Sequence, residues 1–280
     1  MRATDTSGEE RKRGRSDGVE PVALRDTCDR NYTAAFAALI PHVGSSTGGT
    51  RSFGTVTAVV TGLTEAFYNP VMVTSAEAAP GDVTAAVRWS RSLGVPASVV
   101  LREDLRERFE STVRGVGLEP NRWADPGMAL HPIPPTPPAP PELRIEVVDA
   151  ATFDDWHAGI SYGPNFRRVY GPTLIEDPTF RLVVGYVEDQ PVAGAAAILT
   201  GNAVGIYAVG TAERARRRGF GRAMTWAAIQ AGVEAGCSVA VLQSSEMAVS
   251  LYRWMGFVEV CRYIDYEPVE GSAGGPASPA

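Results

Sequence analysis

The sequence predicts a mixed α/β fold in two parts, with a smaller N-terminal α/β domain followed by a larger C-terminal one. Two observations predict this organisation. Short apolar runs typical of strands alternate with helical patterns in both halves of the chain. Between the halves stands Pro-Ile-Pro-Pro-Thr-Pro-Pro-Ala-Pro-Pro at residues 132–141, which favours a stiff, extended spacer.

These patterns define five segments. The two tails are poor in apolar groups that could form a core, so we expect them to be disordered. The proline-rich run also fits an SH3-type ligand, but its position between two structured halves favours a linker. The expected segments are a tail at 1–20, an N-terminal domain at 21–130, a linker at 131–142, a C-terminal domain at 143–267 and a tail at 268–280.

In the N-terminal domain, apolar periodicity and the breakers Pro and Gly delimit the elements. Pro41 would stop the first helix, and Gly115 or Gly117 would end the last. The expected order is a helix at 29–40, strands at 54–62 and 69–74, a helix at 81–93, a strand at 97–101 and a helix with Leu105, Phe109 and Val113 on one face.

The C-terminal domain shows more strands. A strand at 143–148 precedes a helical, loop-rich stretch, and a hairpin follows with its turn at 188–190. The remaining elements are a strand at 203–209, a helix to about residue 235, a strand from 239, a helix from near 246 and a strand from 257. In the last helix, Ser244 and Ser245 are placed to cap the start, Gly256 to end it, and Met247, Leu251, Trp254 and Met255 to face the core.

The Arg/Gly-rich loop at 210–222 joins a strand to a helix. Backbone N–H groups in the first turn of a helix have no intrahelical partners, and the helix dipole is positive there, so this loop favours a phosphate or pyrophosphate. A Walker loop is excluded, because the only lysine is Lys12. A dinucleotide fingerprint is excluded, because Met224 stands where the third glycine belongs.

The pattern Arg216-x-x-Gly219-x-Gly221 resembles the acyl-CoA pyrophosphate loop of the GNAT superfamily of N-acetyltransferases. A second piece, from Leu251-Tyr252 to Gly256-Phe257, is similar to the terminal signature of that family. The resemblance covers about residues 143–267 and implies a mixed, mostly antiparallel central sheet flanked by helices. Residues 97–118 loosely resemble 239–259, which indicates a tandem protein with a degenerate N-terminal copy; an unrelated α/β partner domain is the alternative.

The resemblance implies acetyl-CoA as co-substrate and no metal. The backbone of Tyr207, Ala208 and Val209 would pair with the pantetheine arm, and Tyr252 would be the general acid for the thiolate. Ser245 replaces the asparagine that the family often has near that arm, which puts this contact in doubt. The residues expected to hold the pyrophosphate are Arg216, Arg217, Arg218, Gly219, Phe220, Gly221 and Arg222.

The general base is less clear from the sequence. The cofactor strand carries no glutamate, which leaves Glu176, Asp177 or a water chain. Direct attack by a primary amine needs no nucleophile from Cys237 or Cys261, and His42 and His157 have structural roles. The acceptor would be bound by residues 152–180 and the partner domain, where Trp156, Tyr162, Phe166 and Tyr170 form either a pocket wall or a core.

Composition limits the partners. A net charge of −6 and a pI near 5.2 argue against nucleic acid or an anionic membrane as partner. The sequence lacks an apolar signal core and an apolar run of ~18 residues, and its three scattered cysteines favour a cytoplasmic protein without disulfides. We therefore expect a cytoplasmic monomer or homodimer that acetylates a small-molecule or protein amine. The alternatives are a non-catalytic acyl-CoA-binding regulatory module and a scaffold that recruits partners through its prolines.

Overall fold

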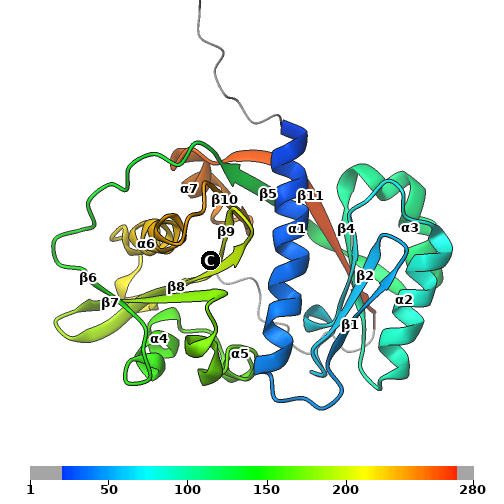
Figure 1. The fold of residues 1–280 in the computed structure, drawn as a ribbon, viewed down its shortest axis with the longest axis horizontal. Helices are drawn as coiled ribbons and strands as arrows, with labels where there is room; N and C mark the ends of the chain where they lie inside the picture. The colour runs from blue at the N-terminus through cyan, green and yellow to red at the C-terminus, as the bar shows by residue number, and fades with distance from the viewer. Residues whose placement is uncertain (1–20, 270–280) are drawn as a thin grey trace, which may run out of the picture.

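The computed structural model describes residues 21–269, so the tail at 1–20 and nearly all of the C-terminal tail lie outside the described residues. One 11-stranded sheet runs through both halves (Figure 1). Neighbouring strands are antiparallel except β3–β4 and β9–β10, which confirms the mixed, mostly antiparallel sheet. In sheet order the strands are β1 (Gly49–Phe53), β2 (Val56–Val60), β3 (Pro70–Val73), β4 (Ser98–Arg102), β11 (Val258–Pro268), β5 (Leu118–Leu130), β10 (Val239–Gln243), β9 (Ala203–Thr211), β8 (Gln190–Thr200), β7 (Phe180–Val187) and β6 (Arg144–Val147).

Helices cover both faces of this sheet. The longest, α1, lies across its middle and contacts strands of both halves, as Figure 1 shows. Helices α2 and α3 pack on the N-terminal strands, while α4 and α6 pack on β7 to β9. The helices are α1 (Pro21–Leu39), α2 (Pro80–Ser92), α3 (Arg106–Gly115), α4 (Phe153–Ile160), α5 (Pro164–Val169), α6 (Phe220–Glu234) and α7 (Val249–Trp254), with 3₁₀ turns η1 (Ile40–His42), η2 (Ala66–Tyr68), η3 (Glu103–Leu105), η4 (Pro172–Glu176) and η5 (Glu213–Ala215).

The two halves repeat one topology and exchange strands. The order β3-α2-β4-α3-β5 recurs as β9-α6-β10-α7-β11, and in each half the first two strands are parallel neighbours. The third strand of each half pairs with the second strand of the other half: β5 pairs with β10, and β11 pairs with β4. Strands β5 and β11 also pair with each other, so the halves form one continuous sheet.

The hairpin is confirmed, and its turn has a clear cause. Glu188 and Asp189 both have positive φ, 50° and 60°, as a two-residue type I′ turn between β7 and β8 requires. Strands β1 and β5, however, were not predicted. Pro120 and Pro126 lie within β5, and proline is unusual in a central strand because it donates no ladder hydrogen bond. Strand β10 covers only residues 127–130 of β5, so the proline-containing part has an open edge.

The proline-rich segment wraps around α6 between β5 and β6 (Figure 1). Four strands separate β5 from β6 in the sheet, about 24 Å at the usual strand spacing. A dozen residues of polyproline helix reach roughly 37 Å, enough to pass over α6. Thr136 Oγ1 donates a hydrogen bond to Gln230 Oε1 on α6 at 3.0 Å, and Ile133 packs against the apolar cluster beneath that helix. The segment is therefore docked on the C-terminal half.

A buried ion pair ties α1 to the sheet. Arg102 Nη1 on β4 lies 2.7 Å from Asp29 Oδ2 on α1, and the two side chains are 5% and 10% exposed. The Tyr263 hydroxyl on β11 donates to Asp29 Oδ1 at 2.6 Å. Hydrogen bonds to a charged, buried group are strong. Arg102 also pairs with the half-exposed Asp104, at 2.6 Å. Asp29 thus connects α1 to one strand of each half.

Replacing Asp29 tests this connection. We expect Asp29→Ala to lower the free energy of unfolding by about 2–3 kcal/mol, because Arg102 Nη1 and the Tyr263 hydroxyl lose their buried acceptor while Asp104 still compensates the charge of Arg102. Asp26→Ala is the control on the same helix: Asp26 is 45% exposed and pairs with Arg25, so its loss costs less than about 1 kcal/mol. Urea denaturation followed by circular dichroism measures both, and equal losses would contradict the assignment.

Candidate active site

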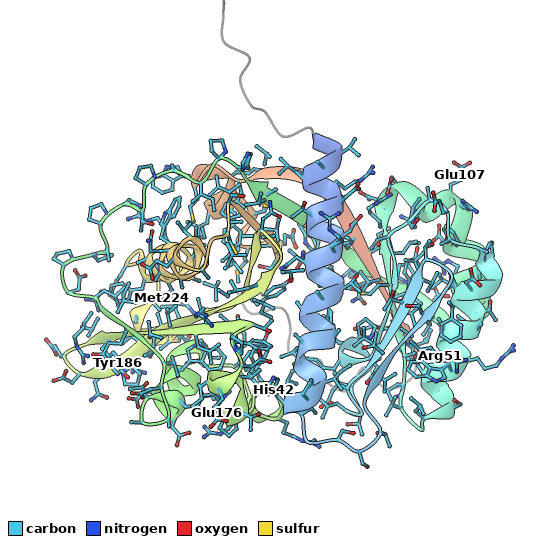
Figure 2. All side chains as sticks on the ribbon, viewed as in Figure 1. His42, Arg51, Glu107, Glu176, Tyr186 and Met224 are labelled. Carbon is cyan, nitrogen blue, oxygen red and sulfur yellow. The ribbon has the colours of Figure 1, made fainter. Side chains whose placement is uncertain are left out.

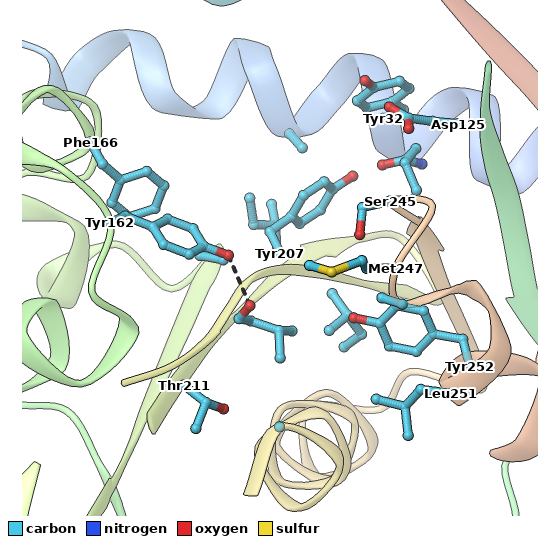
Figure 3. Close-up of a pocket in the computed structure, with 18 of the residues that line it drawn as sticks. Tyr32, Asp125, Tyr162, Phe166, Tyr207, Thr211, Ser245, Met247, Leu251 and Tyr252 are labelled. Atoms are coloured by element: carbon cyan, nitrogen blue, oxygen red, sulfur yellow. Dashed lines mark hydrogen bonds between the residues drawn. The ribbon is translucent and has the colours of Figure 1, made fainter. Parts of the chain in front are cut away.

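A cavity of about 860 Å³ opens where β9 and β10 separate. The two strands pair only from Ala203 to Gly205 on β9, and beyond that point they line opposite sides of the cavity. Figure 3 shows this space with α1 along one side and α6 and α7 along the other. Residues from α1, η2, β5, β11 and the segment around α5 complete the wall, so both halves of the chain build the cavity.

Strand β9 carries a bulge at the cavity. Gly194 of β8 pairs with Gly210 but Ala196 pairs with Tyr207, so two residues of β9, Ala208 and Val209, face one residue of β8. Ala208 has φ +52°, a conformation that is unusual for alanine. A bulge turns backbone groups away from the ladder, and such strained residues cluster at binding sites. The three residues expected beside the pantetheine arm, 207–209, all line the cavity.

The Arg/Gly loop forms the start of α6 at the cavity. Gly219 precedes the helix with φ +81°, which favours glycine, and a Cβ on Gly221 would contact only Thr211 Oγ1, at 3.5 Å. The helix start is therefore open to a ligand, and its N–H groups and dipole favour an anion. Six of the seven residues expected at the pyrophosphate line the cavity: Arg216, Arg217, Gly219, Phe220, Gly221 and Arg222.

Arg218 is the seventh residue, and it lies outside the cavity lining. Its Nη2 donates to Glu142 Oε1 at 3.4 Å, and its guanidinium lies 4.7 Å from the centre of the Phe220 ring. This contact joins the loop to the end of the proline-rich segment.

Tyr252 of α7 lines the same cavity and is 7% exposed (Figure 3). Burial raises the pKa of its hydroxyl to about 12, so the phenol keeps its proton throughout the neutral range. Ser245, from the turn before α7, lines the cavity beside it. The Tyr252 phenol, the Ser245 hydroxyl and the bulged segment of β9 thus line the same cavity.

Helix α7 differs from expectation in two respects. It begins at Val249 and has no side-chain cap: the Ser244 hydroxyl donates to the carbonyl of Ser245 instead. Met247 and Trp254, expected in the core, are 68% and 69% exposed. The helix is too short for its whole apolar pattern to reach the sheet, and the Trp254 ring instead lies 5.0 Å from the Arg222 guanidinium. Gly256 ends the helix with φ +98°, as predicted.

The aromatic residues near α5 divide between wall and core. Tyr162, Phe166 and Tyr170 line the cavity, and the Tyr162 hydroxyl donates to the Val209 carbonyl at 2.8 Å. Trp156 is fully buried instead and donates to the Ala195 carbonyl at 3.1 Å. The aromatic wall therefore holds the bulged segment of β9 in position.

The carboxylates expected as bases do not line the cavity. Asp177 Oδ2 lies 3.0 Å from His42 Nε2, and Glu176 lies at the outer edge of the fold (Figure 2). His157 Nε2 donates to the Tyr170 carbonyl at 2.9 Å, a structural contact. The three cysteines are free thiols, and none of them contributes to the cavity wall.

Three other carboxylates, which the sequence analysis did not identify, line one end of the cavity: Asp125 on β5, and Asp265 and Glu267 on β11. Burial raises the pKa of Asp125 to about 7. Burial, together with the negative charges of Asp125 and Glu267, raises the pKa of Asp265 well above its ordinary value. The alternation Asp265-Tyr266-Glu267 in the sequence indicates two acids on one face of a strand. The third acid, Asp125, lies on the partner strand β5, which was not predicted.

Within residues 21–269, no group of three His, Cys, Asp or Glu side chains is arranged to hold a metal ion. Over the same residues, no helix combines the length and the apolar character needed to cross a membrane.

Solved structures share this fold. A GCN5-related N-acetyltransferase from Kribbella flavida matches with a TM-score of 0.69 at 20% identity, covering 88% of this chain and 97% of its own. A tandem GNAT protein from the clavulanic acid biosynthesis pathway matches with a TM-score of 0.54 at 11% identity, covering 89% and 97%. A GCN5-related N-acetyltransferase from Sphaerobacter thermophilus matches with a TM-score of 0.52 at 21% identity, covering 75% of each chain. The first two matches span both halves, which supports the tandem arrangement.

No curated protein sequence matches the chain. The model of the acetyltransferase (GNAT) family matches residues 148–257, a range that contains the bulged strand, the Arg/Gly loop and Tyr252. Residues 148–257 therefore form an acetyltransferase (GNAT) family domain.

Proposed function

We propose that the protein transfers an acetyl group from acetyl-CoA to a primary amine. One observation carries the proposal: the bulged edge of β9, the open start of α6 and the buried Tyr252 all face one cavity. These elements supply, in turn, backbone groups for an extended arm, an anion site for a pyrophosphate and a proton donor.

The proposed reaction is a direct transfer. The amine nitrogen forms a bond to the thioester carbonyl carbon, the C–S bond breaks, and its electron pair goes to sulfur. A backbone N–H from the bulge at Ala208 and Val209 polarises the carbonyl, and holding both reactants in one cavity supplies proximity. The phenol of Tyr252 gives its proton to the thiolate, and the proton lost by the amine passes to water and restores the phenol.

Two features of the cavity support this route. No cysteine lines it, which fits a mechanism without an acyl-enzyme. The pKa of Tyr252 is raised to about 12 by burial, and the same burial would raise the pKa of the departing thiol, so the two groups stay closer in acidity than the tyrosine value alone indicates.

A non-catalytic acyl-CoA-binding module is the alternative function. It would use the same loop but would not release free CoA when an amine is added. Thiol release therefore separates it from the transferase.

The first functional prediction concerns acetyl-CoA binding at the Arg/Gly loop. Acetyl-CoA at about 100 times its dissociation constant should stabilise the protein by about 2.7 kcal/mol, visible as a rise in melting temperature. Gly221→Asp should abolish this rise without harming the fold, because the added side chain has room in the free protein but puts negative charge where the pyrophosphate would bind. Gly221→Ala is the matched control, since it adds a Cβ without charge. Normal acetyl-CoA binding by Gly221→Asp would show that the loop assignment is wrong.

The second functional prediction concerns Tyr252. Tyr252→Phe keeps the buried ring but removes the proton donor, so kcat for thiol release should fall by about 10²–10⁴-fold while the melting-temperature shift with acetyl-CoA is retained. Tyr186→Phe is the control, because that tyrosine lies outside the cavity and its hydroxyl bonds Asp155. An unchanged kcat in Tyr252→Phe would remove the tyrosine from the mechanism.

A further inference from the structure

The acidic end of the cavity is built by the exchanged strands. Asp125 comes from β5, and Asp265 and Glu267 come from β11, which pairs with it. The register of this pair shifts between Ile264 and Tyr266, so Asp265 lies opposite the stretch Asn121–Trp123. Both Asn121 and Trp123 also line the cavity. An irregular ladder thus turns a cluster of polar side chains toward the same space.

These carboxylates lack a positive partner in the described structure. Among residues 21–269, no ion pair within 4.0 Å involves any of the three. Arg262, on the same strand, pairs with Glu259 at 2.6 Å instead, and its guanidinium lies over the Trp123 ring. Burying like charges together without a counter-charge is unfavourable, so this end of the cavity is suited to a cation.

Unsatisfied polar atoms point to a ligand at the same place. Asp265 is 8% exposed, and its Oδ1 has no hydrogen-bond partner. Gln243 Oε1, also in the cavity wall, is buried and unpartnered as well. Buried polar atoms are nearly always hydrogen-bonded in folded proteins. Both of these oxygen atoms accept hydrogen bonds, which complements a ligand rich in N–H donors.

The surroundings favour an organic cation. The described acidic side chains are not arranged as a metal-holding group. Aromatic rings line the cavity next to them, and such rings bind both aliphatic chains and ammonium groups. In Figure 3, Tyr32 lies beside Asp125 at the α1 end, and Tyr252 lies at the α7 end. Trp123 also lies beside Asp125, and Phe36, Phe67 and Tyr68 continue from Tyr32 along the wall through successive ring contacts.

We propose, on the basis of the acetyl-transfer function above, that Asp125, Asp265 and Glu267 bind a second ammonium group of the acceptor. The acceptor is then a diamine or polyamine: one nitrogen reacts near Tyr252, the other sits among the carboxylates, and an aliphatic spacer lies along the aromatic wall. The reacting nitrogen is selected by its distance from the bound one.

The test compares 1,4-diaminobutane and spermidine with butylamine, which lacks the second nitrogen. In the wild type, kcat/KM for CoA release should be at least about 30-fold higher for the better dication than for butylamine, the size expected when a buried charge pair is formed. The double variant Asp265→Asn, Glu267→Gln should lose most of this ratio by losing activity toward the dications, with butylamine little changed. Asp125→Asn should lower the ratio in the same direction.

The controls separate this inference from the proposed function. Glu107→Gln removes an acidic side chain on the outer surface of α3 (Figure 2) and should behave as the wild type. The melting-temperature rise with acetyl-CoA should persist in every carboxylate variant. Equal kcat/KM for dications and butylamine, with CoA release intact, would overturn the acidic subsite and leave the transferase standing.

Calorimetry decides the case in which no amine supports CoA release. That result would count against the transferase. Binding of spermidine to the wild type, lost in the double variant, would still support the acidic subsite; no binding to the wild type would overturn it.

Discussion

The pairing of β5 with β10 determines how the two halves of the sheet meet. Only residues 127–130 of β5 pair with β10, and Gly127 is needed there, because a Cβ would lie 2.5 Å from Cys261 Sγ and 2.7 Å from the Tyr263 ring. The preceding part of β5 leaves β10 and runs along the cavity beside β11. One exchange of strands therefore joins the halves into a single sheet and closes the end of the cavity that faces α1.

The parts of the fold that could be predicted are those with local signals. The hairpin at β7–β8, the loop from Arg216 to Gly221 and the helix that ends at Gly256 are all encoded in contiguous residues. Strand β5 could not be predicted, because Pro120 and Pro126 interrupt the pattern of a strand. Its exchange could not be predicted either, since the edge of β4 or β10 is complementary to any extended segment and local sequence does not specify which one arrives.

The same distinction applies to the site. The residues expected at acetyl-CoA lie in two short segments, so their motif predicted a shared wall, and all but Arg218 line the cavity. The direction of Arg218 depends on Glu142, a residue far away in sequence. The acidic end combines Asp125 with Asp265, which are even farther apart in sequence and meet only through an irregular ladder. A carboxylate in a strand pattern indicates a half-buried acid, but its partners come from tertiary structure.

The two halves share a topology but differ where the cavity opens. In the N-terminal half, β3 pairs with β4 along its whole length, from Pro70 to Val73, so no gap opens of the kind found between β9 and β10. The helix that follows begins with Pro80 and has Asp82 in its first turn, and this negative charge is unfavourable for an anion. The described N-terminal half thus lacks the strand gap and the acid-free helix start that the C-terminal half has at the proposed acyl-CoA site. The N-terminal half instead supplies α1, η2 and β5, which form the cavity wall opposite the Arg/Gly loop. The proposed acceptor site therefore requires both halves of the chain.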